Sequence, residues 1–268
     1  IEGENIEERE NIELFSGTYR VTKTSIDTQK ELEELKKRAE NASYKVSSVE
    51  TKEINRKPYA PLTTATMQAT GAGIGFSSAQ TMRLAQKLYE EGYITYHRTD
   101  SQFIADSAIE ASRKFIESNL GAEYIPNSPV HYQTKSKTAQ EAHEAIRPTD
   151  VKVKPAEVRK LGDKEAKLYD LIWRQTIACQ MKPAVFTRTT VELEGDGLVF
   201  RGVGRILKFE GWLKIRPRIR KKTKENEVPF LKEGDELEAD ELKEEEHETS
   251  PPPRYSEASL IKELKKND

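Results

Sequence analysis

The sequence predicts an α+β fold in which a mainly helical domain is inserted between two halves of a β-rich domain. Polar and apolar residues alternate with the period of a strand in residues 12–24 and 44–54, and a strand-rich stretch returns at 187–244. From about 56 to 184 the apolar residues recur mostly at helical spacing. At 268 residues the chain is long enough for one large or two modest domains, each with its own core.

Domain boundaries are predicted where these patterns change. The β-rich domain is expected to be discontinuous, and the three prolines at 251–253 are expected to lead into a further helical domain. The predicted ranges are 1–55 with 183–250 for the β-rich domain, 56–182 for the inserted helical domain, and 251–268 for the start of the next one.

Each element has a local signal. In the β-rich part a charged helix is expected over 27–41, where Thr28 and Glu31 can form a capping box. Turns are expected at the glycines of 195–197 and 234–235.

Three helices are expected in the inserted part. The first covers 77–91 and ends at Gly92. Asp106 is expected to cap a second helix that runs to Leu120, and residues 164–181 form a third.

The most informative segment follows the first helix and reads Gly92-Tyr93-Ile94-Thr95-Tyr96-His97-Arg98-Thr99-Asp100-Ser101. A short strand is expected here, so that Ile94, Tyr96 and Arg98 share one face. Alternation sends His97 to the other face, and no part in proton transfer is expected for it.

A phenol beside a guanidinium suits covalent catalysis on a phosphodiester. A free tyrosine has a pKa of about 10 and is a poor nucleophile unless a neighbour stabilises the phenolate. Arg98 can do so, and its fork of donors can hold two phosphate oxygens in the transition state. An aryl phosphodiester stays reactive enough for a DNA hydroxyl to displace the tyrosine, so the strand can be resealed without ATP. A Tyr-x-Arg pair alone is also typical of ordinary strand packing.

Four further segments extend the pattern, in order and at suitable spacing. They are Lys57-Pro58-Tyr59-Ala60-Pro61-Leu62-Thr63-Thr64-Ala65-Thr66-Met67-Gln68, Ala139-Gln140-Glu141-Ala142-His143-Glu144-Ala145-Ile146-Arg147-Pro148-Thr149, Leu168-Tyr169-Asp170-Leu171-Ile172-Trp173-Arg174-Gln175, and Pro252-Pro253-Arg254-Tyr255-Ser256-Glu257-Ala258-Ser259-Leu260-Ile261. With the tyrosine segment they resemble the type IA DNA topoisomerases. The resemblance implies a toroidal enzyme fragment, in which a β-rich arch carries the inserted domain with the active-site tyrosine.

The resemblance also implies roles for individual residues. Tyr96 would be the nucleophile that forms a 5′-phosphotyrosine, Arg98 would clamp the scissile phosphate, and His143 would contact DNA and assist cleavage. Residues expected to contact or support DNA binding are Thr95, Asp100, Arg147, Arg254 and Ser256.

Parts of such an enzyme are not found in this sequence. Nothing matches the toprim domain, which supplies a glutamate for acid-base work and an acidic cluster for Mg²⁺, and no cysteine-rich zinc ribbons are present. We therefore interpret the chain as an internal fragment that is inactive in DNA relaxation by itself. Its expected partners are single-stranded or negatively supercoiled DNA and the rest of the same polypeptide, and we expect a monomer.

Two residues bear on alternative interpretations of the sequence. His97 stands where many bacterial members have methionine, and reverse gyrases are similar in having histidine there, so the topoisomerase part of a reverse gyrase is an alternative. The Glu141 to Arg147 segment looks superficially like a zinc-protease helix, but Arg147 replaces its second histidine. No metal site is expected in this chain.

Composition and charge are compatible with this interpretation. The net charge is −2, but seven bases lie between residues 214 and 224, and ten acids lie between 233 and 248. The basic run could follow phosphates or be a solvated loop, and the acidic run is expected to be a strand with an exposed edge. The single cysteine, Cys179, is expected to be a buried helical thiol, which favours a reducing, cytoplasmic compartment. No apolar run is long enough for a membrane span.

Two rival functions remain. A non-catalytic module for single-stranded DNA would use Arg98, His143 and the basic run for affinity only. A tyrosine recombinase would need an arginine-histidine-arginine set ahead of a late tyrosine, whereas here Tyr96 precedes His143.

Overall fold

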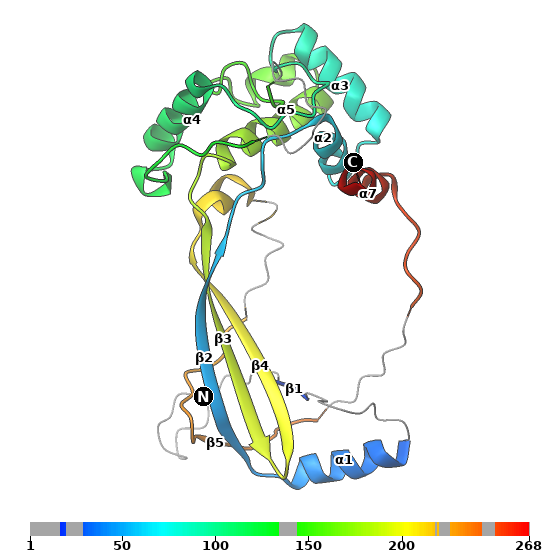
Figure 1. Cartoon of the computed structure of the whole chain (residues 1–268), viewed down its shortest axis with the longest axis vertical. Coiled ribbons are helices and arrows are strands. Elements are labelled where there is room, and N and C mark those ends of the chain that lie inside the picture. The colour runs from blue at the N-terminus through cyan, green and yellow to red at the C-terminus, as the bar shows by residue number, and fades with distance from the viewer. Residues whose placement is uncertain are drawn as a thin grey trace. The chain divides into compact units, whose positions relative to one another are not determined.

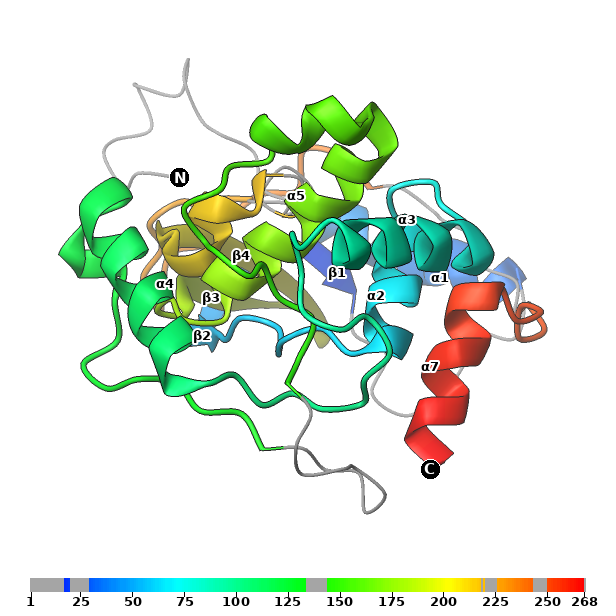
Figure 2. The same ribbon diagram turned by 90° about the horizontal axis from the view of Figure 1, so that it is seen from above.

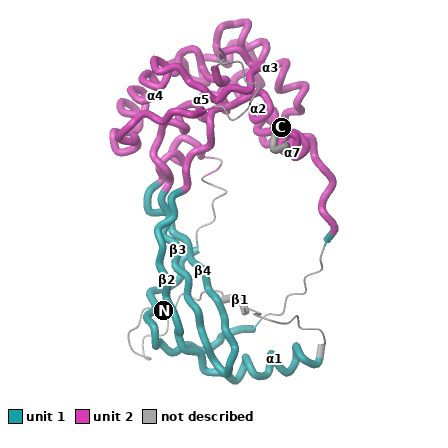
Figure 3. The backbone as a smooth tube through the Cα atoms, viewed as in Figure 1, with its two compact units in different colours: residues 1–55, 185–209, 223–250 teal, residues 56–184, 210–222, 251–268 magenta. Residues whose placement is uncertain are grey.

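A computed structural model describes residues 17–19, 29–133, 144–217, 219, 226–242 and 250–267 (Figure 1). The chain divides into two compact units, which Figure 3 distinguishes by colour. Unit 1 comprises residues 1–55, 185–209 and 223–250, and unit 2 comprises 56–184, 210–222 and 251–268. The architecture is α+β, as the sequence predicts. Residues 210–222 and 251–268 group with the helices of unit 2, whereas the sequence assigned them to the arch and to a further domain.

Unit 1 is built on a five-stranded sheet with the order β1-β4-β3-β2-β5. Its strands are β1 (Gly17–Tyr19), β2 (Tyr44–Arg56), β3 (Ala184–Gly195), β4 (Leu198–Phe209) and β5 (Glu236–Leu237). The hairpin between β3 and β4 turns at Asp196 and Gly197, whose φ angles of 49° and 72° match a type I′ turn. The turn predicted at 195–197 is thus confirmed. Of the acidic run, only Glu236–Leu237 is a strand among the described residues.

One helix and a small core complete the described part of unit 1. Helix α1 (Gln29–Asn41) confirms the predicted charged helix, although Thr28 of its expected capping box lies outside the described residues. Arg38 Nε donates to Asp196 Oδ2 at 2.9 Å and ties α1 to the hairpin turn. The core consists of Tyr44, Val46, Val191, Leu231 and Leu237.

Unit 2 holds helices α2 (Thr64–Ala72), α3 (Ser78–Glu90), α4 (Asp106–Asn119), α5 (Asp163–Ala178) and α7 (Glu257–Asn267). α5 contacts both α3 and α4 and lies between them (Figure 2). The largest fully buried side chains of unit 2 are Trp212, Tyr169, Met67, Leu88, Ile94, Ile116, Ile146, Leu168, Ile172, Ile177, Met181 and Leu213. In the described residues, no helix is both long and apolar enough to cross a membrane.

Local signals explain how α3 begins and ends. Ser77 is the N-cap and its hydroxyl accepts a hydrogen bond from Gln80 N. At the other end Gly92 adopts φ 74°, and Tyr93 N donates to Leu88 O, which closes the last turn. The predicted helix over 77–91 is confirmed to within one residue at each end.

The prediction that Asp106 caps α4 is wrong. The N-cap is Ala105, which has no side chain for this purpose, and Asp106 lies in the first turn. Glu144 Oε1 instead accepts a hydrogen bond from Ala105 N at 2.8 Å. A carboxylate from a distant segment therefore holds the main-chain N–H of the N-cap residue, one position before the predicted cap.

Cys179 ends α5 as its C-cap and is fully buried, as predicted. Its Sγ donates to Thr176 O at 3.0 Å, and burial raises the pKa of the thiol to about 12. The thiol therefore stays protonated near neutral pH and is a poor nucleophile.

The start of the basic run is packed onto α5 rather than forming a solvated loop. A short 3-10 helix, Gly211–Ile215, contacts α5, and Arg174 Nη1 donates to Ile215 O at 2.9 Å. Burial lowers the pKa of Arg216, whose guanidinium also donates to Leu171 O. Most of the other bases of the run lie outside the described residues.

Trp212 is the largest side chain buried by this packing and gives a stability prediction. It is 0% exposed, its Nε1 donates to Arg56 O at 2.8 Å, and the ring of Tyr59 lies 5.3 Å away. Trp212→Ala should lower the free energy of unfolding by about 3–5 kcal/mol, because it removes buried area and leaves a cavity. Urea denaturation followed by circular dichroism measures this. Phe230→Ala is the control, since Phe230 is 69% exposed and should change stability little. A loss below about 1 kcal/mol for Trp212→Ala would contradict the packing.

Candidate active site

The tyrosine segment is held between two other parts of unit 2. On one side Thr64 N donates to Thr99 O, and Thr64 Oγ1 donates to His97 O at 2.9 Å and accepts from Thr99 N at 2.8 Å. On the other side Thr95 N donates to Arg147 O at 2.9 Å. The segment is therefore fixed by bonds to residues far away in the sequence.

The predicted short strand is wrong. Only an isolated bridge between Ile94 and Pro148 has strand pairing, and the residues after it form bends. The reason is that threonine hydroxyls, from Thr64 and Thr95, take up main-chain groups that a neighbouring strand would otherwise pair.

Exposure agrees with the predicted alternation only from Tyr96 onward. Tyr96 is 43% exposed and Arg98 is exposed, while His97 and Thr99 are buried. Ile94 was expected on the face of Tyr96 but is 1% exposed and belongs to the core. A nucleophile candidate and a cation are thus both presented to solvent from a fixed backbone.

Arg98 is available for a ligand. None of the described residues forms an ion pair or hydrogen bond with its side chain. Arg147 is different, because its guanidinium is engaged by Glu144 (Nη2 to Oε2 at 2.7 Å) and donates to Pro148 O at 2.9 Å. The two arginines of this region therefore have different environments, one open and one internal.

His97 lies on the buried face, opposite to Tyr96, as alternation predicts, but the two rings are nevertheless in contact. Their ring centroids are 5.3 Å apart, and Tyr89 lies 5.3 Å from Tyr96 and 5.8 Å from His97. His97 is 4% exposed, and its Nδ1 is buried with no hydrogen-bond partner in the described part of the chain. Burial, and then the charge of Arg98, lower the pKa of His97, against an opposite effect of Glu90. The imidazole is therefore neutral near neutral pH.

Tyr89 is a site residue that sequence reasoning missed. Its helical spacing placed it among the packing positions of α3, whereas it is 43% exposed and contacts Tyr96 edge to face. The usable signal was its position three residues before Gly92, where the chain reverses and brings the next segment back along the helix end.

Thr95 and Arg147 fix the backbone around the site. Thr95 Oγ1 donates to Ala145 O at 2.7 Å and accepts from Arg147 N at 3.0 Å. Asp100 is exposed. Whether any of these three contacts DNA stays a prediction.

Arg254 and Ser256 are not brought to Tyr96. Ser256 immediately precedes α7, and its Oγ accepts a hydrogen bond from Ser259 N at 3.2 Å. The adjacent Glu257 accepts from Ser78 N, at the opposite end of α3 from Gly92. A helix of 13 residues separates these ends by roughly 20 Å. Arg254 is exposed in the same region.

His143 lies outside the described residues, so its expected role stays a prediction. The next residues, 144 to 149, pack beside the tyrosine segment: Ala145 N donates to Phe103 O at 2.7 Å and Ile146 pairs with Leu62.

The described residues do not form a metal site. In these ranges no three histidine, cysteine, aspartate or glutamate side chains come together to hold an ion. The described residues thus do not fit the Mg²⁺ that the resemblance implies for the whole enzyme.

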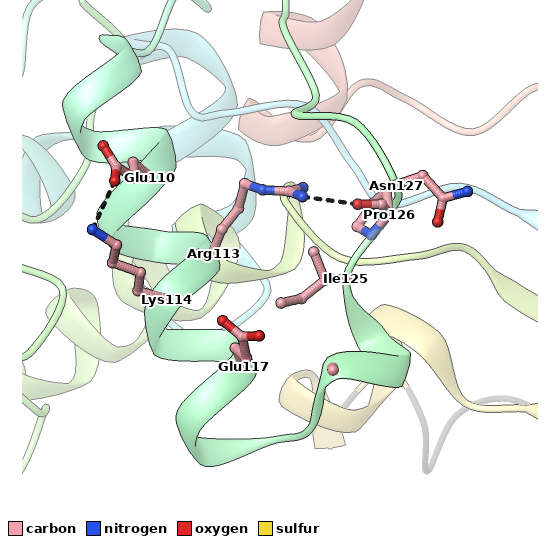
Figure 4. Close-up of a pocket in the computed structure, with 8 residues that line it drawn as sticks. Glu110, Arg113, Lys114, Glu117, Ile125, Pro126 and Asn127 are labelled. Carbon is pink, nitrogen blue, oxygen red and sulfur yellow. Dashed lines mark hydrogen bonds and ion pairs between the residues drawn. The ribbon is translucent and has the colours of Figure 1, made fainter.

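A surface pocket of about 380 Å³ lies elsewhere, between α4 and residues 122–127 (Figure 4). Three of its four charged groups are engaged internally: Arg113 Nη2 donates to Pro126 O at 2.9 Å, and Lys114 pairs with Glu110 at 2.7 Å. Since no residue of the tyrosine segment lines it, the pocket gives no functional assignment.

Comparisons with known proteins agree with this geometry. A family model described as "DNA topoisomerase" matches residues 3–268. The DNA topoisomerase 1 of Haemophilus influenzae is 39% identical over 263 residues, which are 98% of this chain and 30% of that protein. The DNA topoisomerase 1 of Escherichia coli is 45% identical over 228 residues, 85% of this chain and 26% of that protein.

A solved structure gives the same result. Full-length topoisomerase I from Thermotoga maritima superimposes with a TM-score of 0.77 at 32% identity, over 96% of this chain and 42% of that chain. The chain thus spans about 30% of the length of its curated relatives. The tyrosine segment, the fold and these matches together show that the chain belongs to the type IA DNA topoisomerase family.

Proposed function

We propose that this chain supplies the nucleophile for transient cleavage of a single DNA strand, through which another strand passes before resealing. The whole enzyme would in this way relax negative supercoils without ATP. The observation that carries the proposal is the exposed Tyr96 two residues from an exposed Arg98 that has no partner among the described residues, on a backbone that distant residues fix.

The covalent step exchanges one phosphorus–oxygen bond for another. Tyr96 Oη attacks the phosphorus, a bond forms between them, and the bond from phosphorus to the 3′ oxygen breaks. The phenol loses its proton, and the leaving 3′ oxygen gains one from a general acid. Resealing reverses each change, since the 3′ hydroxyl displaces the tyrosine.

The side chains around Tyr96 have distinct proposed roles. Arg98 pairs with phosphate oxygens and stabilises the charge that develops on them. Thr95 and Arg147 hold the backbone through their mutual hydrogen bonds. His143 assists cleavage by contacting DNA, and Asp100, Arg254 and Ser256 remain proposed DNA contacts.

The general acid and Mg²⁺ would come from a toprim domain outside this chain. The partners would be single-stranded or negatively supercoiled DNA and the rest of the polypeptide, acting as a monomer in the cytoplasm. The topoisomerase part of a reverse gyrase is a second candidate because of His97, but the contacts of His97 with Tyr89 and Tyr96 serve either enzyme equally.

A covalent-trapping assay tests the proposed function. The chain is mixed with a separately made toprim-containing piece, Mg²⁺ and a single-stranded oligonucleotide labelled at one end, and is then denatured. A 5′-phosphotyrosine keeps the 3′ label on the protein and releases the 5′ label. Peptide mapping should place the adduct on Tyr96. Retention of the 5′ label would overturn the proposed polarity, and tight DNA binding without an adduct, once a pull-down shows that the pieces assemble, would favour the non-catalytic binding module.

The isolated 268-residue chain is expected not to relax supercoiled plasmid. It would hold the nucleophile without the acid that must protonate the 3′ oxygen, and general acid catalysis alone contributes about 10² to 10⁴-fold. Agarose-gel relaxation over a range of protein concentrations measures this, with the complete enzyme as positive control. Relaxation that tracks the purified chain and disappears with Tyr96→Phe would contradict it.

A further inference from the structure

We propose that Tyr89 is a positioning residue that holds the ring of Tyr96 for attack by packing edge to face against it. This inference rests on the proposed function, because it assumes that Tyr96 is the nucleophile. The ring centroids lie 5.3 Å apart with an interplanar angle of 66°, which is a favourable arrangement for two aromatic rings.

Tyr89 stands on a rigid support. It lies in the last turn of α3, between Leu88, which is 0% exposed, and the reversal at Gly92. Tyr89 O accepts from Gly92 N at 2.9 Å, and Leu88 O accepts from Tyr93 N at 2.8 Å. The end of α3 is therefore joined by hydrogen bonds to the residues that lead to Tyr96.

His97 forms the buried side of the same aromatic group. Its centroid is 5.8 Å from that of Tyr89 and 5.3 Å from that of Tyr96, and its main-chain oxygen accepts from Thr64 Oγ1. Since burial keeps the ring neutral, it packs against both tyrosines without needing a counterion. Tyr96 is thus supported by one exposed ring and one buried ring.

The exposure of Tyr89 separates positioning from ordinary stabilisation. At 43% exposed, the side chain is only partly buried, and its aromatic contacts among the described residues are with Tyr96 and His97. Loss of the Tyr89 contact would widen the range of orientations of the Tyr96 ring, and fewer of them would align the phenolic oxygen with the phosphorus. Restricting reactants to a near-attack geometry is a recognised source of rate.

The test uses the complete protein to which this chain belongs, in its wild-type form and as Tyr89→Phe and Tyr89→Leu variants. The measurements are the single-turnover rate of oligonucleotide cleavage at saturating DNA, the dissociation constant for the same oligonucleotide, and Tm. Tyr89→Phe keeps the ring and should cleave within about twofold of wild type. Tyr89→Leu should cleave about tenfold more slowly, which is the upper range for the loss of an aromatic pair. Its affinity and Tm should stay unchanged.

Phe230→Leu is the matched control, since it replaces an exposed aromatic ring whose described contact is with Lys232. Wild-type cleavage by Tyr89→Leu would overturn the proposal. The proposal would also be overturned if Tyr89→Leu bound DNA more weakly but cleaved at the wild-type rate once DNA was saturating. Tyr89 would then act in binding, by stacking on a base. A fall in Tm that accounts for the lost activity would make Tyr89 structural. Failure of the proposed function itself is distinguishable, because the wild-type protein would then form no adduct, or Tyr96→Phe would still form one.

Discussion

Tyr96→Phe is expected to abolish the covalent adduct with single-stranded DNA and to bring relaxation by the complete enzyme below detection. The substitution removes only the phenolic oxygen, and with it the atom that forms the bond to phosphorus. The ring and its contacts with Tyr89 and His97 are kept, so Tm and DNA affinity should be unchanged. Denaturing gels of labelled oligonucleotide measure the adduct, and filter binding measures the affinity.

Two other tyrosine variants make this result interpretable. Tyr255→Phe removes a hydroxyl from a side chain that is 64% exposed near α7 and should leave activity unchanged. Tyr89→Phe removes the hydroxyl nearest in kind to that of Tyr96, because both tyrosines are 43% exposed and in ring contact. If Tyr96→Phe still formed the adduct and Tyr89→Phe did not, the nucleophile would be Tyr89 and the assignment of Tyr96 would be wrong.

Local elements of the fold could be predicted because their signals are local. Helix α3 begins after Ser77 and ends before Gly92 because of hydrogen bonds to residues within a few positions. The hairpin at Asp196 and Gly197 needs only two residues with positive φ. The burial of Cys179 followed equally well from its apolar neighbours on α5.

Features that failed depend on partners far away in the sequence. The predicted strand around Tyr96 was replaced by hydrogen bonds from Thr64 and Arg147, which lie 35 and 52 residues from their partners in that segment. The predicted Asp106 cap is wrong because Ala105 is the N-cap, and its N–H is held by Glu144, 39 residues away. No periodicity within a single segment encodes such contacts.

The candidate site divides in the same way. That Tyr96 and Arg98 share a face could be predicted from their spacing, whereas their role was proposed from the family resemblance. The support from Tyr89 could not, because helical periodicity describes one helix and not the ring that the chain brings back against its end. The ring contacts of His97 with Tyr89 and Tyr96 could not be predicted for the same reason, since Tyr89 belongs to another element.

Arg98→Ala is expected to slow cleavage at saturating DNA by about 10² to 10³-fold, the loss typical of removing one preorganised donor from a developing oxyanion. The exposed guanidinium has no partner among the described residues, so its removal should cost little stability. Arg98→Lys should recover part of the rate, because a lysine keeps the charge and loses the two-point fork. Single-turnover cleavage and Tm together measure both effects.

His97 offers an independent readout of the same substitution. The charge of Arg98 helps to lower the pKa of His97, so Arg98→Ala should move that pKa upward while burial continues to hold it down. NMR titration of the imidazole measures the shift. Arg147→Ala is the contrasting variant: it breaks the pair with Glu144, which also holds Ala105 N at the start of α4, and should lower Tm as well as activity. If Arg98→Ala raised the pKa of His97 but left the cleavage rate unchanged, the guanidinium would lie beside the site without acting on the phosphate. Another residue would then have to bind the scissile phosphate.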